Sequence, residues 1–190
     1  MGPYELLQRI VETLEQLDVP CLVTGSVAAM AYGEPCLTND IDIVASIEER
    51  HVAGLVAAFP PDEFYISEQM IREAIRRRLR FNIIHPSSGL KVDIIIRKGT
   101  PFDTSCFGRI RRIRPAESYI ANFAAPEDIV IMKMQYYRDG GSEKHLRDIT
   151  GILKVSRDDV DLNYIADWSR RLEVTDVWQM ILQRMGEEFR

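Results

Sequence analysis

The order of apolar and polar residues predicts a helix near the beginning of the chain and short strands soon after it. Between residues 3 and 17, apolar side chains recur every three or four positions, the spacing of an amphipathic helix. Residues 21–23 and 40–45 are short, mainly apolar runs bounded by turn-forming residues, which is typical of strands. Ser26 is a suitable N-cap for a helix that follows it. Three segments are expected to be helical: residues 27–32, 48–59 and 68–79.

Two β-rich runs in the middle of the chain are expected to pair as antiparallel neighbours. They cover residues 80–84 and 91–96, and the segment between them, residues 85–89, has the composition of a hairpin loop. Helical patterns dominate afterwards, at residues 126–138, 142–153 and, as one or two helices, 158–190.

This order of elements predicts an α/β (α+β) fold with two parts. The strands lie in a core at residues 1–115, and a helical C-terminal lobe at residues 116–190 is expected to pack on it. At 190 residues and 46% hydrophobic composition, the chain can bury one substantial core.

Composition narrows the functional classes. No apolar run approaches the roughly 20 residues of a membrane span, and the N-terminus lacks a basic segment followed by a long apolar one, so we expect a cytoplasmic protein without membrane contact. The three cysteines have no metal-ligand spacing, which argues against a zinc site or a disulfide framework. The net charge of -5 disfavours indiscriminate nucleic-acid binding.

The strongest candidate chemistry is a set of carboxylates on the expected strands. Asp40 and Asp42 are two residues apart, so a strand would place both side chains on one face. Crowded carboxylates favour a cation between them, and Mg²⁺ prefers oxygen ligands of this kind. Two harmless surface aspartates would have the same spacing.

A third carboxylate strengthens the metal interpretation. Asp93 interrupts another apolar strand, where aspartate is otherwise disfavoured. If the two strands are neighbours, the three carboxylates converge and can hold two metal ions about 3.5 to 4 Å apart. Asp93 on an edge strand facing water is the alternative. Gly25, at the end of the first strand, would let backbone N–H groups approach a phosphate.

These motifs together resemble a known signature. Gly25-Ser26, then thirteen residues, then Asp40-Ile41-Asp42-Ile43, and later Val92-Asp93-Ile94, are similar to the DNA polymerase beta-like nucleotidyltransferase superfamily over residues 20–97. The resemblance implies a small mixed sheet flanked by helices. It also implies that Gly25 and Ser26 contact the triphosphate of an NTP, that Asp40 and Asp42 bind Mg²⁺, and that Asp93 holds a metal and helps to deprotonate the attacking hydroxyl.

A second group of residues extends the resemblance. The run from Pro126 to Lys133, followed by Arg147-Asp148, is similar to the C-terminal part of the AbiEii toxin-like branch of the superfamily. In that branch Lys133 would contact the nucleotide phosphates and Asp148 would lie near the same pocket. The alternative is that these are solvated or ion-paired surface residues, which are common and contribute little stability.

Two arginine-rich blocks interrupt the otherwise acidic sequence. Such clustering has two interpretations: a polyanion-binding face that suits a tRNA-like acceptor, or a solvated charged face without a ligand. Neither block contains interleaved aromatic residues that would stack on bases. The blocks are Arg72, Arg76, Arg77, Arg78 and Arg80, and Arg109, Arg111, Arg112 and Arg114.

The sequence therefore predicts an Mg²⁺-dependent nucleotidyltransferase that moves an NMP from an NTP to a hydroxyl of a macromolecular acceptor, tRNA or protein. The resemblance implies a toxin–antitoxin or phage-defence component, with a cognate antitoxin as a partner. Two alternatives remain open: a small-molecule (antibiotic) nucleotidyltransferase, and a non-catalytic nucleotide-binding module of the same fold.

Overall fold

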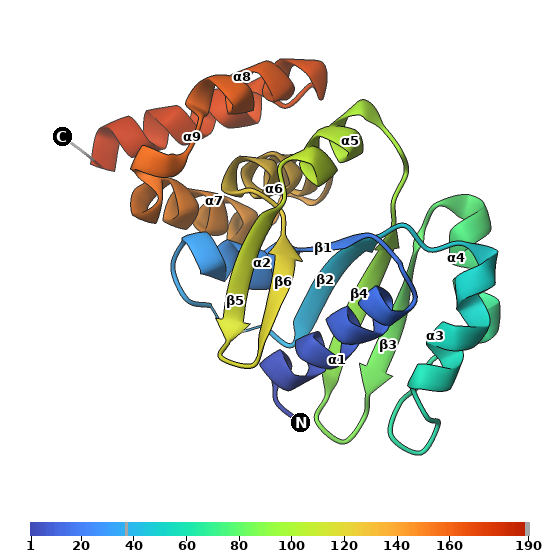
Figure 1. Cartoon of the computed structure of the whole chain (residues 1–190). Coiled ribbons are helices and arrows are strands. Elements are labelled where there is room, and N and C mark those ends of the chain that lie inside the picture. Colours follow the sequence, from blue (N-terminus) through green and yellow to red (C-terminus); the bar gives the residue numbers. More distant parts are fainter. Residues whose placement is uncertain (37, 189–190) are drawn as a thin grey trace. The chain divides into compact units, whose positions relative to one another are not determined.

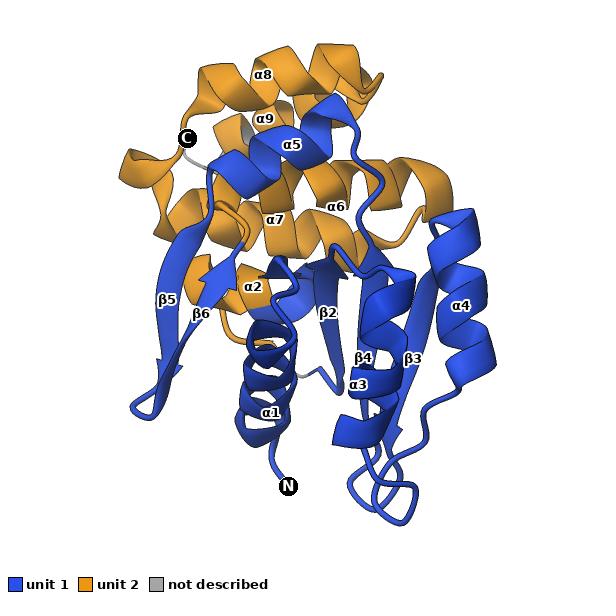
Figure 2. Ribbon diagram, turned by 45° about the vertical axis from the view of Figure 1, so that its right-hand side comes forward, with its two compact units in different colours: residues 1–27, 37–123 blue, residues 28–36, 124–190 orange. Residues whose placement is uncertain are grey.

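The computed structural model describes residues 1–36 and 38–188, which form two compact units (Figure 2). Of the described residues, the first contains 1–27 and 38–123, and the second contains 28–36 and 124–188. The boundary lies within helix α2 (Gly25–Tyr32). The domain division at residue 115 that the sequence suggested stays a prediction.

The first unit is built on a six-stranded mixed sheet with the order β3-β4-β2-β1-β6-β5 (Figure 1). Neighbours β2 and β4, and β1 and β6, are parallel, whereas β1 and β2, β3 and β4, and β5 and β6 are antiparallel. The expected hairpin and mixed sheet are therefore confirmed. The strands are β1 (Cys21–Thr24), β2 (Asp40–Ala45), β3 (Arg80–His85), β4 (Leu90–Ile96), β5 (Arg111–Ala116) and β6 (Tyr119–Phe123).

Helices α1 and α3 lie over one face of this sheet (Figures 1 and 2). Alternate residues of the central strands, such as Ile41, Ile43 and Ile94, are almost completely buried and form the core. The helices and 3-10 turn of this unit are α1 (Pro3–Gln16), η1 (Glu49–His51), α3 (Val52–Ala58), α4 (Glu68–Arg77) and α5 (Pro101–Gly108).

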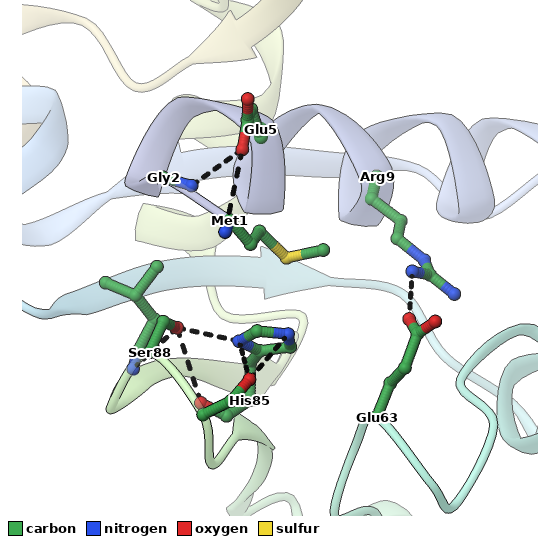
Figure 3. Close-up of polar contacts among 9 residues, drawn as sticks. Met1, Gly2, Glu5, Arg9, Glu63, His85 and Ser88 are labelled. Atoms are coloured by element: carbon green, nitrogen blue, oxygen red, sulfur yellow. Dashed lines mark hydrogen bonds and ion pairs between the residues drawn. The ribbon is translucent and has the colours of Figure 1, made fainter.

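Local interactions fix the beginning of α1 and the loops at the same end of the sheet (Figure 3). The backbone N–H of Gly2 donates to Glu5 Oε2 at 2.7 Å and caps the helix, whose first residue is a proline. The His85 ring hydrogen-bonds Ser88 in the β3–β4 loop at 2.7 Å. These contacts explain why the sequence forms a capped helix and a tight hairpin here.

Several predicted boundaries were wrong. The expected helix at residues 48–59 is divided into η1 and α3, because the His51 side chain accepts a hydrogen bond from Glu48 N–H and supports a tight turn. Helix α2 begins at Gly25, so Ser26 lies within its first turn and does not cap it. The sequence also did not predict α5, β5 or β6.

The second unit is helical, as expected. Helix α6 (Pro126–Gly140) buries most of its first two turns, including the polar residues Glu127 and Asp128. Glu127 Oε1 accepts from the N–H of Asp161, and the hydroxyl of Tyr164 donates to Asp128. The other elements are α7 (Glu143–Val155), η2 (Arg157–Asp159), α8 (Leu162–Arg171) and α9 (Thr175–Glu188). Residues 189–190 of the predicted last helix lie outside the described residues. Within the described part of the chain, every helix is too short or too polar to cross a membrane.

Candidate functional site

Strand register brings two of the candidate carboxylates next to each other. Asp42 on β2 is the direct partner of Asp93 on the parallel strand β4, and Asp40 is the partner of Lys91. Asn82 on β3 is opposite Asp93 on its other side. Because partners in a sheet direct their side chains to the same face, these residues share one face of three adjacent strands.

Asp93 is a buried carboxylate with polar partners. Its side chain is 5% exposed and accepts a hydrogen bond from the amide of Asn82. Arg80 Nη1 lies 3.4 Å from Oδ2 and Lys91 Nζ lies 3.3 Å from Oδ1. An ionised carboxylate tolerates such burial only when it is paired and hydrogen-bonded. The alternative of a water-facing edge residue is wrong, since β4 lies between β3 and β2.

Lys91 connects the carboxylates of neighbouring strands. Its ammonium lies 3.4 Å from Asp40 Oδ1 as well as close to Asp93. Burial is the largest single influence and by itself lowers the pKa of Lys91, but the combined attraction of Asp93 and Asp40 is greater, so the pKa is raised. The ammonium of Lys91 is therefore a positive charge that lies between the carboxylates of Asp40 and Asp93.

Gly25 is required by the close approach of Asp42. Its φ of +68° is a conformation that favours glycine, and a Cβ at this position would come within 2.7 Å of Asp42 Cγ. The structure thus gives Gly25 a further reason to be glycine, which is room for the second aspartate. The contact of Gly25 with a phosphate stays a prediction. Ser26, which follows it, is 8% exposed.

The donor set fits Mg²⁺ in its chemistry. Asp40, Asp42 and Asp93 offer only carboxylate oxygens, the hard ligands that Mg²⁺ prefers. Among the described residues, however, no three acidic, histidine or cysteine side chains already stand together as metal ligands. The predicted convergence of all three aspartates on metal ions stays a prediction.

Lys133 and Asp148 form a buried ion pair in the second unit. Lys133 Nζ donates to Asp148 Oδ2 at 2.5 Å, and the two side chains are 4% and 11% exposed. The alternative of solvated surface residues is therefore wrong for this pair. The arginines near this pair in the sequence are not part of it. Arg147 is exposed, and Arg138 donates hydrogen bonds to the carboxylate of Asp139 and the carbonyl of Leu172.

Sequence reasoning missed the residues that surround the candidate carboxylates. Lys91 stands two positions before Asp93, the same spacing as that of Asp40 and Asp42. This spacing indicates that Lys91 and Asp93 share one face of their strand, and it could have identified Lys91. Arg80 was interpreted only as part of a basic block, and Asn82 was not considered.

His145 was also missed as a neighbour of the ion pair. Its ring packs on Tyr136 with centroids 5.6 Å apart. Burial, followed by the positive charge of Lys133, lowers the pKa of His145; Lys144 acts in the same direction and Asp148 opposes them. Its Nδ1 is buried without a hydrogen-bond partner among the described residues.

Comparison with solved structures identifies the fold. No known protein-family profile matches the sequence, and no curated protein is significantly similar to it. An antigenic nucleotidyltransferase-like protein from Paracoccidioides brasiliensis superposes with a TM-score of 0.53 at 17% identity, over 79% of this chain and 74% of that one. The lincosamide antibiotic adenylyltransferase LnuA, lincomycin-bound, gives 0.54 at 13% identity over 82% and 98%.

A third structure agrees with these two. ANT(2")-Ia in complex with adenylyl-2"-tobramycin gives a TM-score of 0.58 at 11% identity, over 92% of this chain and 97% of that one. At such low identities the likeness concerns the fold alone. The chain has the mixed α/β fold of nucleotidyltransferases.

Proposed function

We propose that this protein is a nucleotidyltransferase that moves an NMP from an NTP to a hydroxyl group and releases pyrophosphate. The observation that carries the proposal is the register of β2 and β4, which sets Asp42 beside the buried Asp93 on one face of the sheet. A fold shared with adenylyltransferases supports it. Two adjacent carboxylates on a rigid strand pair suit the positioning and charge compensation that nucleotidyl transfer requires.

The proposed roles follow from the environments of the residues. Asp40 and Asp42 would hold Mg²⁺, with Asp93 as a further ligand; bound Mg²⁺ neutralises phosphate charge and lowers the barrier to displacement. Asp93 accepts the proton of the attacking hydroxyl, and Asn82 holds its carboxylate in place. Lys91 and Arg80 stabilise the ionised carboxylates in the absence of metal.

The phosphates of the NTP are assigned to two other groups. Backbone N–H groups of the first turn of α2, at Gly25 and Ser26, would bind the triphosphate, because N–H groups at a helix N-terminus are unsatisfied and carry positive partial charge. Lys133 would contact a phosphate, and Asp148 would orient its ammonium through their ion pair.

The proposed acceptor is a hydroxyl on a macromolecule, tRNA or protein, in a toxin–antitoxin or phage-defence setting with a cognate antitoxin. A small-molecule acceptor is a second candidate, favoured by the lincomycin- and tobramycin-related complexes among the similar structures. Fold does not fix the substrate, so only a transfer assay separates the two.

The test is transfer of label from each of the four α-³²P-labelled NTPs in Mg²⁺, with total tRNA, a cell lysate, or a panel of lincosamides and aminoglycosides. Asp40→Ala and Asp42→Ala should lose transfer by at least about 100-fold. Asp62→Ala is the matched control, because Asp62 is exposed and lies in a turn outside the strands that carry the candidate carboxylates. Transfer that persists unchanged in both variants would show that this carboxylate site does not catalyse it. No transfer with any NTP and acceptor would leave only the non-catalytic module.

A further inference from the structure

The structure distinguishes the two arginine-rich blocks, which looked equivalent in the sequence. In the first block, arginines of α4 have carboxylate partners on the same helix or on the nearby η1. Arg72 pairs with Glu49 and Glu68, and Arg76 and Arg77 pair with Glu73. The positive charge of this block is therefore largely offset by local negative charge.

The second block has a different environment. Arg111, Arg112 and Arg114 on β5 are exposed, and none of the carboxylates in the described residues forms an ion pair with them. We call these three residues the β5 arginine row. Arg109 is not part of it, because two of its guanidinium nitrogens are buried. A chain with a net charge of -5 thus has three arginines on one strand that form no ion pair with the described carboxylates.

The geometry of β5 directs two of these arginines to one side. In the sheet that the described residues form, β5 is an edge strand and pairs with β6 (Figure 1). Arg112 is opposite Asn122, and the register shift that follows leaves both Arg114 and Pro115 opposite Ile120. Since Ile120 and Asn122 are two residues apart on β6, Arg112 and Arg114 share one face and lie roughly 7 Å apart along the strand.

This face is the one that carries the candidate carboxylates. Phe123 on β6 is the partner of Val23, so Asn122 points to the opposite face, with Thr24. Thr24 is in turn the partner of Asp42. Arg112, beside Asn122, therefore lies on the same face of the sheet as Asp42.

We propose that the β5 arginine row binds the phosphate backbone of a nucleic-acid strand. Guanidinium groups form bidentate hydrogen bonds with phosphate, and the spacing of Arg112 and Arg114 is comparable to that of consecutive phosphates in an extended strand. Such binding needs no catalysis. The bound strand would also supply the acceptor hydroxyl, an inference that rests on the function proposed above. The shared face of Arg112 and Asp42 is consistent with this role.

A protective role for the same residues is the competing explanation. Charged side chains, a proline and a bulge on an edge strand all prevent pairing with other chains, and β5 contains all three. Protection predicts that the arginines affect aggregation only, whereas docking predicts a specific, salt-dependent affinity for phosphates.

The experiment measures binding of fluorescein-labelled 20-nucleotide single strands of RNA and of DNA by fluorescence anisotropy, in EDTA and without NTP, between 50 and 200 mM salt. The test variant is Arg111→Gln/Arg112→Gln/Arg114→Gln. The control is Arg72→Gln/Arg76→Gln/Arg77→Gln, which removes the same charge from the paired block. Thermal melting verifies that both variants fold.

We expect the β5 variant to bind at least about tenfold more weakly. The slope of log Kobs against log salt should also decrease in magnitude by about 1.4, since Arg112 and Arg114 share the binding face and each phosphate that is no longer neutralised accounts for about 0.7. The control should remain close to wild type. The RNA and DNA arms identify which nucleic acid is preferred. Equal weakening in both variants, or no binding by wild type to either strand, would overturn the proposal. Because the measurement uses EDTA and no NTP, nucleotidyl transfer does not take place, and either result is independent of the transfer assay.

Discussion

The carboxylate of Asp42 packs directly against the backbone of Gly25, at the point where β1 passes into α2. A side chain at residue 25 therefore displaces the aspartate that the proposed function needs most. Gly25→Ala should lower the free energy of unfolding by about 2 kcal/mol, from the positive φ and the steric contact together, and should strongly reduce nucleotidyl transfer.

A matched variant separates the two effects. Gly89 also has a positive φ, +69°, but a Cβ there would meet nothing within 4 Å. Gly89→Ala should therefore show the backbone cost alone, about 1 kcal/mol, with normal transfer activity. Urea unfolding and label transfer of the two variants provide the comparison, and equal losses in both would show that contact with Asp42 is unimportant.

The sequence was sufficient to predict the strands that carry the carboxylates. β2 and β4 contain apolar side chains at alternate positions with aspartates between them, and this alternation makes both the strand and its polar face visible. The partnership of Asp42 with Asp93 was not determined, because strand order depends on packing between segments about fifty residues apart.

The residues around the site were harder to predict for a physical reason. Lys91 is a typical surface residue by type, and only the register reveals that its ammonium lies between two carboxylates. The β5–β6 hairpin was missed because β5 contains three arginines and a proline, which hide the alternation of an edge strand.

Lys91→Met should make the protein more responsive to magnesium. Without the ammonium, Asp40 and Asp93 lose a shared counter-ion, so stability in EDTA should fall by about 0.5–1 kcal/mol. Mg²⁺ should then raise the melting temperature more than in wild type, because it no longer competes with Lys91. Lys98→Met, at an exposed position, is the control for loss of a lysine. An Mg²⁺ shift no larger than that of wild type would contradict this explanation.

His145 should make stability depend on pH. Its pKa in the folded protein is lowered below the ordinary value of 6.5, mainly by burial. As the pH falls below about 6.5, the unfolded chain takes up this proton before the folded chain does, so the unfolded state is favoured. The contribution is fully present above the unfolded pKa and is lost as the pH falls through the folded one.

His145→Gln should therefore lose less stability than wild type between pH 7.5 and 5.5 in urea unfolding. An NMR titration of the His145 ring gives an independent measurement, with a midpoint below 6.5 expected. A midpoint at or above that value would show that the buried ring and the nearby Lys133 do not disfavour its charged form.

The ion pair of Lys133 and Asp148 allows structural and functional roles to be separated. Lys133→Met leaves the Asp148 carboxylate buried without its partner, which should cost about 3 kcal/mol in urea unfolding. The double variant Lys133→Met/Asp148→Leu removes both charges and should regain most of this loss, since apolar pairs of similar volume often replace buried ion pairs without penalty.

The double variant thus provides a folded protein without the lysine. If Lys133 contacts the nucleotide, this protein should bind NTP at least about tenfold more weakly in calorimetry, consistent with the loss of a charge-assisted hydrogen bond. Wild-type NTP affinity in the double variant would instead assign the pair to the stability of the helical unit alone.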